Sequence, residues 1–223
     1  MVQMPKENIN NLRAAPVKSL KDQNRWPLLL VMLLNAAVFY TATTTNSLLI
    51  GDIGSLIKGW EALLPAGAAF VFAGVLNELL NNETKARLVF WRWKNPLPGN
   101  QAFSIYASTD PRVDLHSLTR KCGPLPTEPR EQNALWYRLY LSIRNDPAIV
   151  QVHRNYLFTR DYAAISALLL FALGIAGFWK IPSPKFADLY LMLLVGQYLL
   201  VRGAAKNHGI RFVTTVLAIK AAE

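Results

Sequence analysis

The sequence predicts an all-α membrane protein with four transmembrane helices and a mainly helical cytoplasmic block between the second and the third. Composition favours this class. Apolar residues make up 52% of the 223 residues and charged residues only 17%, where an ordinary soluble domain has roughly 25% charged residues. The chain nevertheless carries a net charge of +10. A hydrophobic chain with a cationic excess is typical of membrane proteins whose cytoplasmic parts are basic.

Four apolar runs are the predicted spans. Residues 26–50 contain no charge, and at about 1.5 Å per helical residue they can cross a hydrocarbon core of roughly 30 Å. Residues 63–80 are charged only at Glu78, and residues 162–179 form a third run. Residues 186–201 are a shorter fourth run, which the link IPSPK joins to the third as in a hairpin.

The charges between these runs set the orientation. Residues 1–25 hold five Lys or Arg against two acids, residues 83–160 hold twelve against six, and residues 202–223 hold four against one. The positive-inside rule places all three segments in the cytoplasm, and four crossings satisfy all three placements. Residues 1–25 lack an apolar core, so we expect no cleavable signal peptide there.

We therefore expect a multi-pass protein of the bacterial inner membrane with both termini in the cytoplasm. The predicted segments are a cytoplasmic N-terminal segment (1–25), a first transmembrane hairpin (26–82), a basic cytoplasmic helical block (83–160), a second transmembrane hairpin (161–202) and a cytoplasmic C-terminal tail (203–223).

The stretch LVFWRWKNPLPGNQAF, residues 88–103, puts two tryptophans and two cations in four consecutive positions after the second run. Tryptophan rings favour the headgroup region, and Arg or Lys can extend to lipid phosphates. A nucleic-acid patch is the alternative, but it requires a basic stripe on a soluble fold. We interpret the stretch as the point where a helix leaves the membrane, and we expect interfacial anchors at Trp26, Trp91, Arg92, Trp93 and Trp179.

Helix signals divide the cytoplasmic block. Asp110 before Pro111 predicts a helix start, and Gly123 its end. Residues 130–143 repeat apolar residues at four-residue spacing, as an amphipathic helix does. A further helix is predicted to start after Asp146 and to run without a break into the third span, over about 30 residues in all. NQAFSIYAS, before Asp110, is the one predicted strand.

The block also offers a surface for a partner. We expect a regulatory protein or a nucleoprotein to bind at Trp136, Arg138 and Tyr140, and the cationic excess leaves direct binding of nucleic acid or a nucleotide open. The tail ends in the apolar run VTTVLAI, which is too short to span a membrane. It can form an interfacial helix or dock on the block.

The sequence contains no signature of catalysis, a cofactor or a metal site. His116, His153 and His208 lie far apart, and none belongs to a ligand motif. Asp110, Asp114, His116 and Cys122 are the densest polar group, but Asp114 and His116 diverge on the predicted helix. We therefore expect a non-enzymatic protein without a cofactor.

Polar residues inside the predicted spans need partners there. They serve either in hydrogen bonds between helices or in the lining of a water-filled pore, and Glu78 can instead face the headgroups or pair with Lys85 or Arg87. Small residues at four-residue spacing permit close packing within a bundle or between protomers of a homo-oligomer. The polar residues concerned are Asn35, Thr41, Thr45, Asn77, Glu78 and Gln197.

The architecture, with the blocks LVFWRWKNPLPGNQAF, STDPRVDL and EQNALWYRLY, resembles the small transmembrane effectors of bacterial phage-defence systems, such as those that accompany retrons. The resemblance implies an oligomer that a partner holds inactive and that damages the inner membrane when it is released. It implies no particular functional residue.

The predicted function is accordingly that of a membrane effector which permeabilises or depolarises the inner membrane when a partner triggers it. A membrane scaffold or assembly factor is the first alternative, and an integral-membrane enzyme acting on lipids is the second. An effector would depend on the polar residues of the spans, a scaffold on Trp91, Trp136 and their neighbours, and an enzyme on Asp110, Asp114 or His116.

Overall fold

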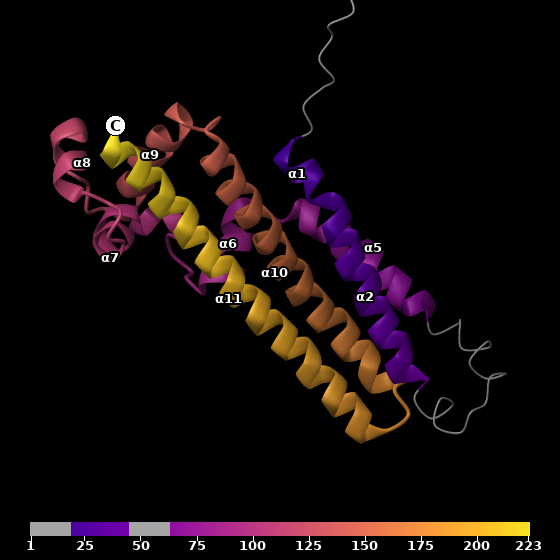
Figure 1. Ribbon diagram of the computed structural model, residues 1–223. Helices are drawn as coiled ribbons and strands as arrows, with labels where there is room; N and C mark the ends of the chain where they lie inside the picture. Colours follow the sequence, from indigo (N-terminus) through magenta and orange to yellow (C-terminus); the bar gives the residue numbers. More distant parts are fainter. Residues whose placement is uncertain (1–18, 45–62) are drawn as a thin grey trace, which may run out of the picture.

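The computed structural model describes residues 19–44 and 63–223, and within these ranges the chain forms helices and no strand (Figure 1). The all-α prediction is confirmed. The predicted strand NQAFSIYAS is wrong. Its residues belong to the 3-10 helix η3 (Pro98–Gln101), the π-helix η4 (Ala102–Tyr106) and α7 (Ala107–Thr109). Gln132 holds this turn, because its Oε1 accepts from the backbone N–H groups of Phe103 and Ser104, each at 3.1 Å.

Two long antiparallel helices, α10 (Pro147–Lys180) and α11 (Pro184–Ala222), form the spine of the molecule (Figure 1). The Asp146 side chain caps α10 by accepting from the N–H groups of Ala148 at 2.8 Å and Ile149 at 3.3 Å. The prediction of one helix running from the block into the third apolar run is therefore confirmed. At about 1.5 Å per residue, α10 is about 50 Å long and α11 about 60 Å, so each exceeds the roughly 30 Å of a hydrocarbon core.

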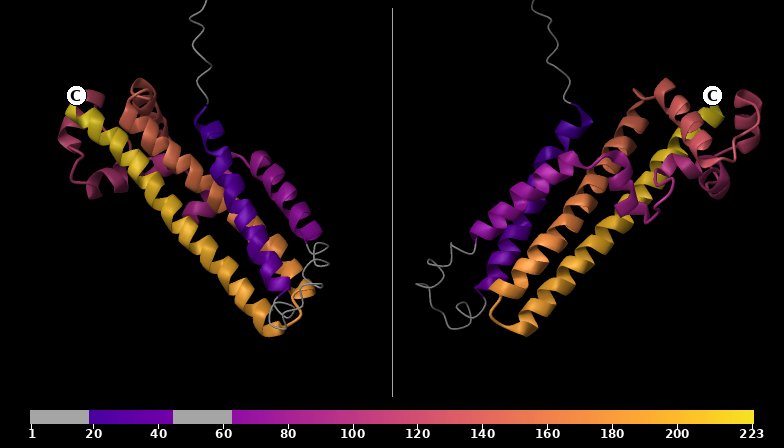
Figure 2. Two further views of the ribbon diagram at one scale, coloured as in Figure 1. Left: turned by 45° about the vertical axis from the view of Figure 1, so that its right-hand side comes forward. Right: turned by 180° about the vertical axis from the view of Figure 1, so that it is seen from behind.

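The N-terminal helices lie along one part of this spine (Figure 2). They are α1 (Leu20–Gln23), α2 (Arg25–Thr43) and α5 (Leu63–Leu79). Three helices in the described ranges are long and apolar enough to cross a membrane: 20–43, α10 and α11. The 17-residue α5 is a shorter apolar helix.

Two separate apolar cores stabilise the fold. The first joins α2, α5, α10 and α11 through residues such as Met32, Ala73, Leu169 and Leu194. The second lies in the block and includes Phe212, whose ring stacks on His153 at 4.6 Å. Each core fixes one half of the α10–α11 spine.

The block packs around the C-terminal half of α11. Its helices are α6 (Asn82–Phe90), α8 (Leu115–Cys122) and α9 (Pro129–Ser142). The second apolar core contains Val213, Val216 and Leu217. Of the two expectations for the tail, docking on the block is therefore correct, and the tail continues the same helix as the fourth apolar run.

One predicted helix start is wrong. The sequence favours Asp110 as the cap of the helix that ends at Gly123, but α8 begins at Leu115 and Asp114 caps it. Asp114 Oδ1 accepts from the N–H groups of His116 at 2.9 Å and Ser117 at 3.1 Å. The Asp110 carboxylate instead binds the Arg112 guanidinium at 2.7 and 3.0 Å, so it is not available to a helix terminus. The predicted end at Gly123 is confirmed, with φ at 78°.

Candidate functional site

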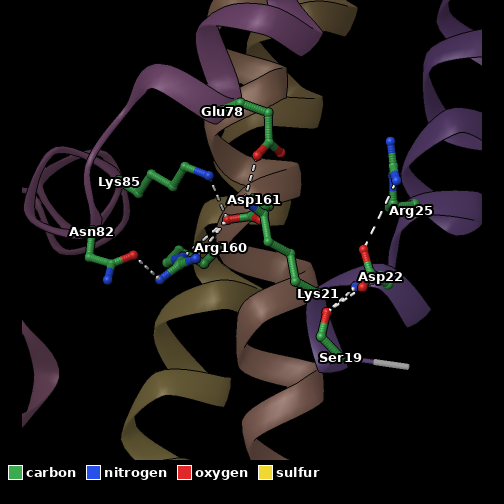
Figure 3. A network of polar contacts seen from close by, with 9 residues as sticks. All are labelled: Ser19, Lys21, Asp22, Arg25, Glu78, Asn82, Lys85, Arg160 and Asp161. Atoms are coloured by element: carbon green, nitrogen blue, oxygen red, sulfur yellow. Dashed lines mark hydrogen bonds and ion pairs between the residues drawn. The ribbon is translucent and has the colours of Figure 1, made fainter. Parts of the chain in front are cut away.

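A buried ionic network lies where α6 meets α10 (Figure 3). Its centre is Asp161 in α10, whose Oδ1 accepts from Lys85 Nζ at 3.0 Å and from Arg160 Nε and Nη2 at 3.1 and 3.0 Å. The side chains of Lys85, Asp161 and Arg160 are 3%, 5% and 10% exposed. Lys85 belongs to α6, so this network fixes α6 to α10 at the start of the third apolar run.

Two cations, Lys85 and Arg160, share the one carboxylate of Asp161 in this network. The three side chains together therefore carry one excess positive charge. Burial lowers the pKa of Lys85 more than its attraction to Asp161 raises it, and Arg160 and Lys21 lower it further. The third nitrogen of Arg160, Nη1, donates to Asn82 Oδ1 at 2.9 Å, and the guanidinium lies over the Tyr156 ring. Removing one partner of such a buried pair typically costs about 3–5 kcal/mol, because it leaves a charge uncompensated.

A second ion pair lies near the network (Figure 3). Lys21 in α1 donates to the Glu78 carboxylate at the end of α5. The expectation that Glu78 pairs with Lys85 or Arg87 is therefore wrong, because Lys85 is bound to Asp161 and Arg87 pairs with Glu83 at 3.3 Å. Lys21 and Glu78 are both more than half exposed, so this pair contributes little to stability by itself.

The N-terminal helices are also tied directly to α10. Asn24, between α1 and α2, donates through Nδ2 to the carbonyl oxygen of Arg154 at 3.0 Å. This bond, the pair between Lys21 and Glu78, and the Asp161 network lie where α1, α5 and α6 approach α10. Together they attach the first hairpin to the spine.

The predicted polar residues of the spans differ in burial: Asn35 and Asn77 are buried, Gln197 is half-buried, and Thr41 and Glu78 are exposed. Asn35 is buried, and its Nδ2 donates to Val31 O of its own helix at 2.9 Å. Gln197 donates to the Tyr162 hydroxyl at 3.2 Å, and Thr41, which is exposed, donates to Val38 O at 2.9 Å. Thr45 lies outside the described residues.

The interior of the membrane part also contains polar atoms without a hydrogen-bond partner. Within the described ranges these are Asn77 Oδ1, Ser166 Oγ and Tyr190 Oη, all buried. The Tyr190 ring packs against Phe39 at 5.8 Å between ring centroids. A buried polar atom without a partner costs roughly 1–3 kcal/mol. The bundle of α2, α5, α10 and α11 therefore retains polar groups that would be more stable if they met water or another hydrogen-bond donor.

Four of the expected interfacial anchors are exposed tryptophans: Trp26, Trp91, Trp93 and Trp179. Asp161 and Trp179 on α10 are 18 residues apart, about 27 Å along a helix, which matches a hydrocarbon core of roughly 30 Å. Arg92 lies over the Phe90 ring and donates to Pro96 O at 3.4 Å. Their role as interfacial anchors stays a prediction.

The expected partner surface is only partly accessible. Trp136 is 6% exposed and packs edge-on against Phe212 at 5.2 Å, so it belongs to the core of the block. Tyr140 is half-buried, and its hydroxyl contacts His153 Nδ1 at 3.2 Å. Arg138 and its neighbour Tyr137 are exposed and remain available to a partner.

The polar group considered for chemistry has structural roles in this fold. Asp110 binds Arg112, which also donates to Thr214 Oγ1 at 3.2 Å, and Asp114 caps α8. Hydrogen bonds from Arg112 lower the pKa of Asp110 well below its usual range. Among the described residues, no three His, Cys, Asp or Glu side chains gather closely enough to hold a metal ion.

Comparison of the chain with family models, with curated proteins and with solved structures found no match.

Sequence reasoning missed the centre of the site, because neither Arg160 nor Asp161 was among the predicted functional residues. A signal was present, since the charged pair Arg160-Asp161 immediately precedes the apolar run 162–179. Charges at the edge of a span are retained only where they find partners or reach the headgroups. The partner Lys85 is 76 positions away, so the pairing itself could not be deduced from spacing.

Proposed function

We propose that the chain is a non-enzymatic effector of the bacterial inner membrane that permeabilises or depolarises the membrane when a partner triggers it. The observation that carries the proposal is the buried Asp161 network, which joins α6 to α10 at the edge of the membrane part. In this proposal the described fold is the closed state, and the network is its latch.

The proposed topology has four crossings with both termini in the cytoplasm. The helix over 20–43, α10 and α11 supply three of them. The fourth is α5, whose 17 residues reach about 26 Å. An even number of crossings follows from the basic N-terminal segment, block and tail, since the positive-inside rule places all three on one side.

The proposed trigger acts on the block and is transmitted by continuous helices. Both α10 and α11 run from the block into the membrane part without a break. A regulatory protein or nucleoprotein bound at the exposed Arg138 would shift α9, which packs on α11 through Trp136 and Phe212. A shift of α10 against α6 would then break the contact between Asp161 and Lys85.

Release of the latch would free α6 from α10 and loosen α5, which ends at Leu79 just before α6 begins. Polar groups that now face inwards, such as Asn35, Asn77 and Ser166, would become accessible. In a homo-oligomer these groups could line a hydrated path, because polar side chains in a membrane gather where they meet water or one another. The exposed apolar residues of α2 and α11 would contact lipid or neighbouring protomers.

Purified full-length protein in liposomes tests this function. We would compare ion leak, reported by a potential-sensitive dye, for the wild type, for Asp161→Asn and for Glu83→Gln. Glu83 is a matched control, since it forms an exposed ion pair with Arg87 on the same helix as Lys85. We expect Asp161→Asn to leak strongly and Glu83→Gln to behave as the wild type. Equal and low leak from all three would refute the latch.

A scaffold or assembly factor is the second candidate, and one observation favours it. The polar side chains of Asn35 and Gln197 are already bonded within the protomer, so they can be silent structural residues. A scaffold would be insensitive to Asp161→Asn in the leak assay. It would instead lose its partner when the exposed Arg138 is replaced by Glu, which pull-down of the full-length chain would report.

A further inference from the structure

A pocket of about 380 Å³ opens between α6, the loop that follows it and α11. Its walls combine apolar and basic groups, with Trp91, Trp93 and Leu88 beside Arg87 and Arg92. In the described part of the chain, no acidic side chain lines it. The lining residues come from the stretch after the second apolar run and from the end of the fourth apolar run. Both segments are predicted to lie at the cytoplasmic boundary of the membrane.

The loop that forms the pocket has a strained backbone. Trp91 and Asn95 have φ angles of 53° and 49°, and they are the non-glycine residues with positive φ in the described ranges. A left-handed conformation is rare and strained for a bulky side chain. It is kept because the surroundings fix Trp91: Nε1 donates to the Tyr198 hydroxyl at 3.1 Å, and that hydroxyl donates to Leu88 O at 2.9 Å. These two hydrogen bonds therefore hold the indole as a rigid wall of the pocket.

Arg92 lines the pocket and has unused capacity to bind an anion, whereas Arg202 lies against the Trp91 ring and is not among the lining residues. Arg202 of α11 stacks on the Trp91 ring at 3.5 Å, and its buried Nε has no hydrogen-bond partner in the described part of the chain. Among the described residues, Arg92 makes two long hydrogen bonds, to Pro96 O at 3.4 Å and the Tyr106 hydroxyl at 3.5 Å. Within the described ranges neither guanidinium forms an ion pair, whereas Arg87 is compensated by Glu83.

Apolar residues continue the site away from the charges. Leu88 and Trp93 line the pocket, and the Trp93 ring is exposed. Anionic headgroups are recognised by basic pockets between membrane helices, and a phosphodiester accepts several N–H bonds from guanidinium groups. Here the basic groups and the apolar surface lie side by side, as the headgroup and the acyl chains of a lipid require.

We propose that this pocket binds the phosphodiester headgroup of an anionic phospholipid, with Arg92 as its main ligand and the acyl chains against the exposed Trp93 ring. The site differs from the Asp161 network and does not depend on the proposed effector function. It would hold α6 against α11 at the membrane surface.

Titration of the detergent-solubilised full chain with short-chain phosphatidylglycerol, followed by native mass spectrometry, tests the proposal. We expect one lipid to bind with preference over short-chain phosphatidylcholine. Arg92→Gln should weaken it about tenfold, because it removes charge-assisted hydrogen bonds. Arg92→Lys keeps the charge and should retain most of the affinity, which guards against misfolding of the Gln variant. Lys94→Gln is the control, since this exposed cation lies two positions from Arg92 but outside the pocket.

Three results would overturn the proposal. Equal binding of phosphatidylcholine would show that the anionic charge is not recognised. An equal loss of affinity in Lys94→Gln would show that the positive surface charge alone explains the binding, without the pocket. Displacement of the lipid by inorganic phosphate at equal concentration would assign the pocket to free phosphate, whereas a lipid site should keep its ligand because the acyl chains contribute to binding.

Discussion

The sharpest prediction concerns Asp161→Asn, which keeps the size of the side chain and removes its charge. The carboxylate accepts three hydrogen bonds of 3.0–3.1 Å from Lys85 and Arg160. The substitution would leave these two buried cations without a counter-charge. We expect a loss of about 3–5 kcal/mol in the free energy of unfolding, the usual cost of removing one partner of a buried ion pair.

The loss should be measurable as a shift in the unfolding temperature of the purified full-length chain. For proteins of about 150–250 residues, 1 kcal/mol corresponds to about 2–4 °C, so the expected fall is about 6–20 °C. The control Glu83→Gln breaks a partly exposed pair spaced four residues apart on α6 and should cost under about 1 kcal/mol. Equal shifts of the unfolding temperature in the two variants would refute the reasoning, because the cost of breaking an ion pair would then not depend on its burial.

The pH dependence of the same variant gives a second check. Burial lowers the pKa of Lys85 below its ordinary value of 10.5, so the unfolded chain binds this proton more tightly and stability rises with pH towards 10.5. Without the attraction to Asp161 that raises it, the pKa falls further. The gain in unfolding temperature between neutral and alkaline pH should therefore be larger in Asp161→Asn than in the wild type.

Three further predictions follow from single contacts. Lys85→Met should destabilise much less than Asp161→Asn in the same thermal assay, since it leaves one cation opposite one carboxylate, and an equal loss would contradict this. Asn77→Leu should raise the unfolding temperature, because it removes a buried oxygen without a partner in the described ranges, and when added to Asp161→Asn it should reduce the ion leak of that variant in liposomes; an increased leak would count against the closed state. Gly209→Ala should cost about 1–3 kcal/mol by overpacking, since its Cβ would meet Phe90 Cζ at 2.8 Å and Tyr156 Cε2 at 2.9 Å, whereas Gly196→Ala meets nothing within 4 Å and should be tolerated.

Local signals predicted much of the fold. Asp146-Pro147 gave the start of α10, because an Asp N-cap followed by Pro favours a helix in almost any context. The same type of signal failed at Asp110-Pro111, since the Arg112 side chain takes the carboxylate and the next Asp caps the helix instead. The strand prediction failed for a non-local reason, because Gln132 from α9 reorganises the backbone around Ser104.

The candidate site was harder to predict than the fold. Glu78, Asn35 and Gln197 could be singled out, since a polar residue in an apolar run is visible in the sequence. Their partners depend on which helices are neighbours and on the faces that they share. Lys85 could therefore be assigned to Glu78 from proximity along the chain, although the fold brings it to Asp161 in α10.

The membrane potential of bacteria that express the chain tests the central claim most directly. Wild type, Asp161→Asn and Glu83→Gln would be compared at matched amounts in the membrane fraction. If the buried network holds the effector closed, Asp161→Asn depolarises the cells soon after induction while the other two leave the potential unchanged. An unchanged potential with Asp161→Asn, in a protein whose unfolding temperature has fallen as expected, would show that the network only stabilises the fold and would contradict the account.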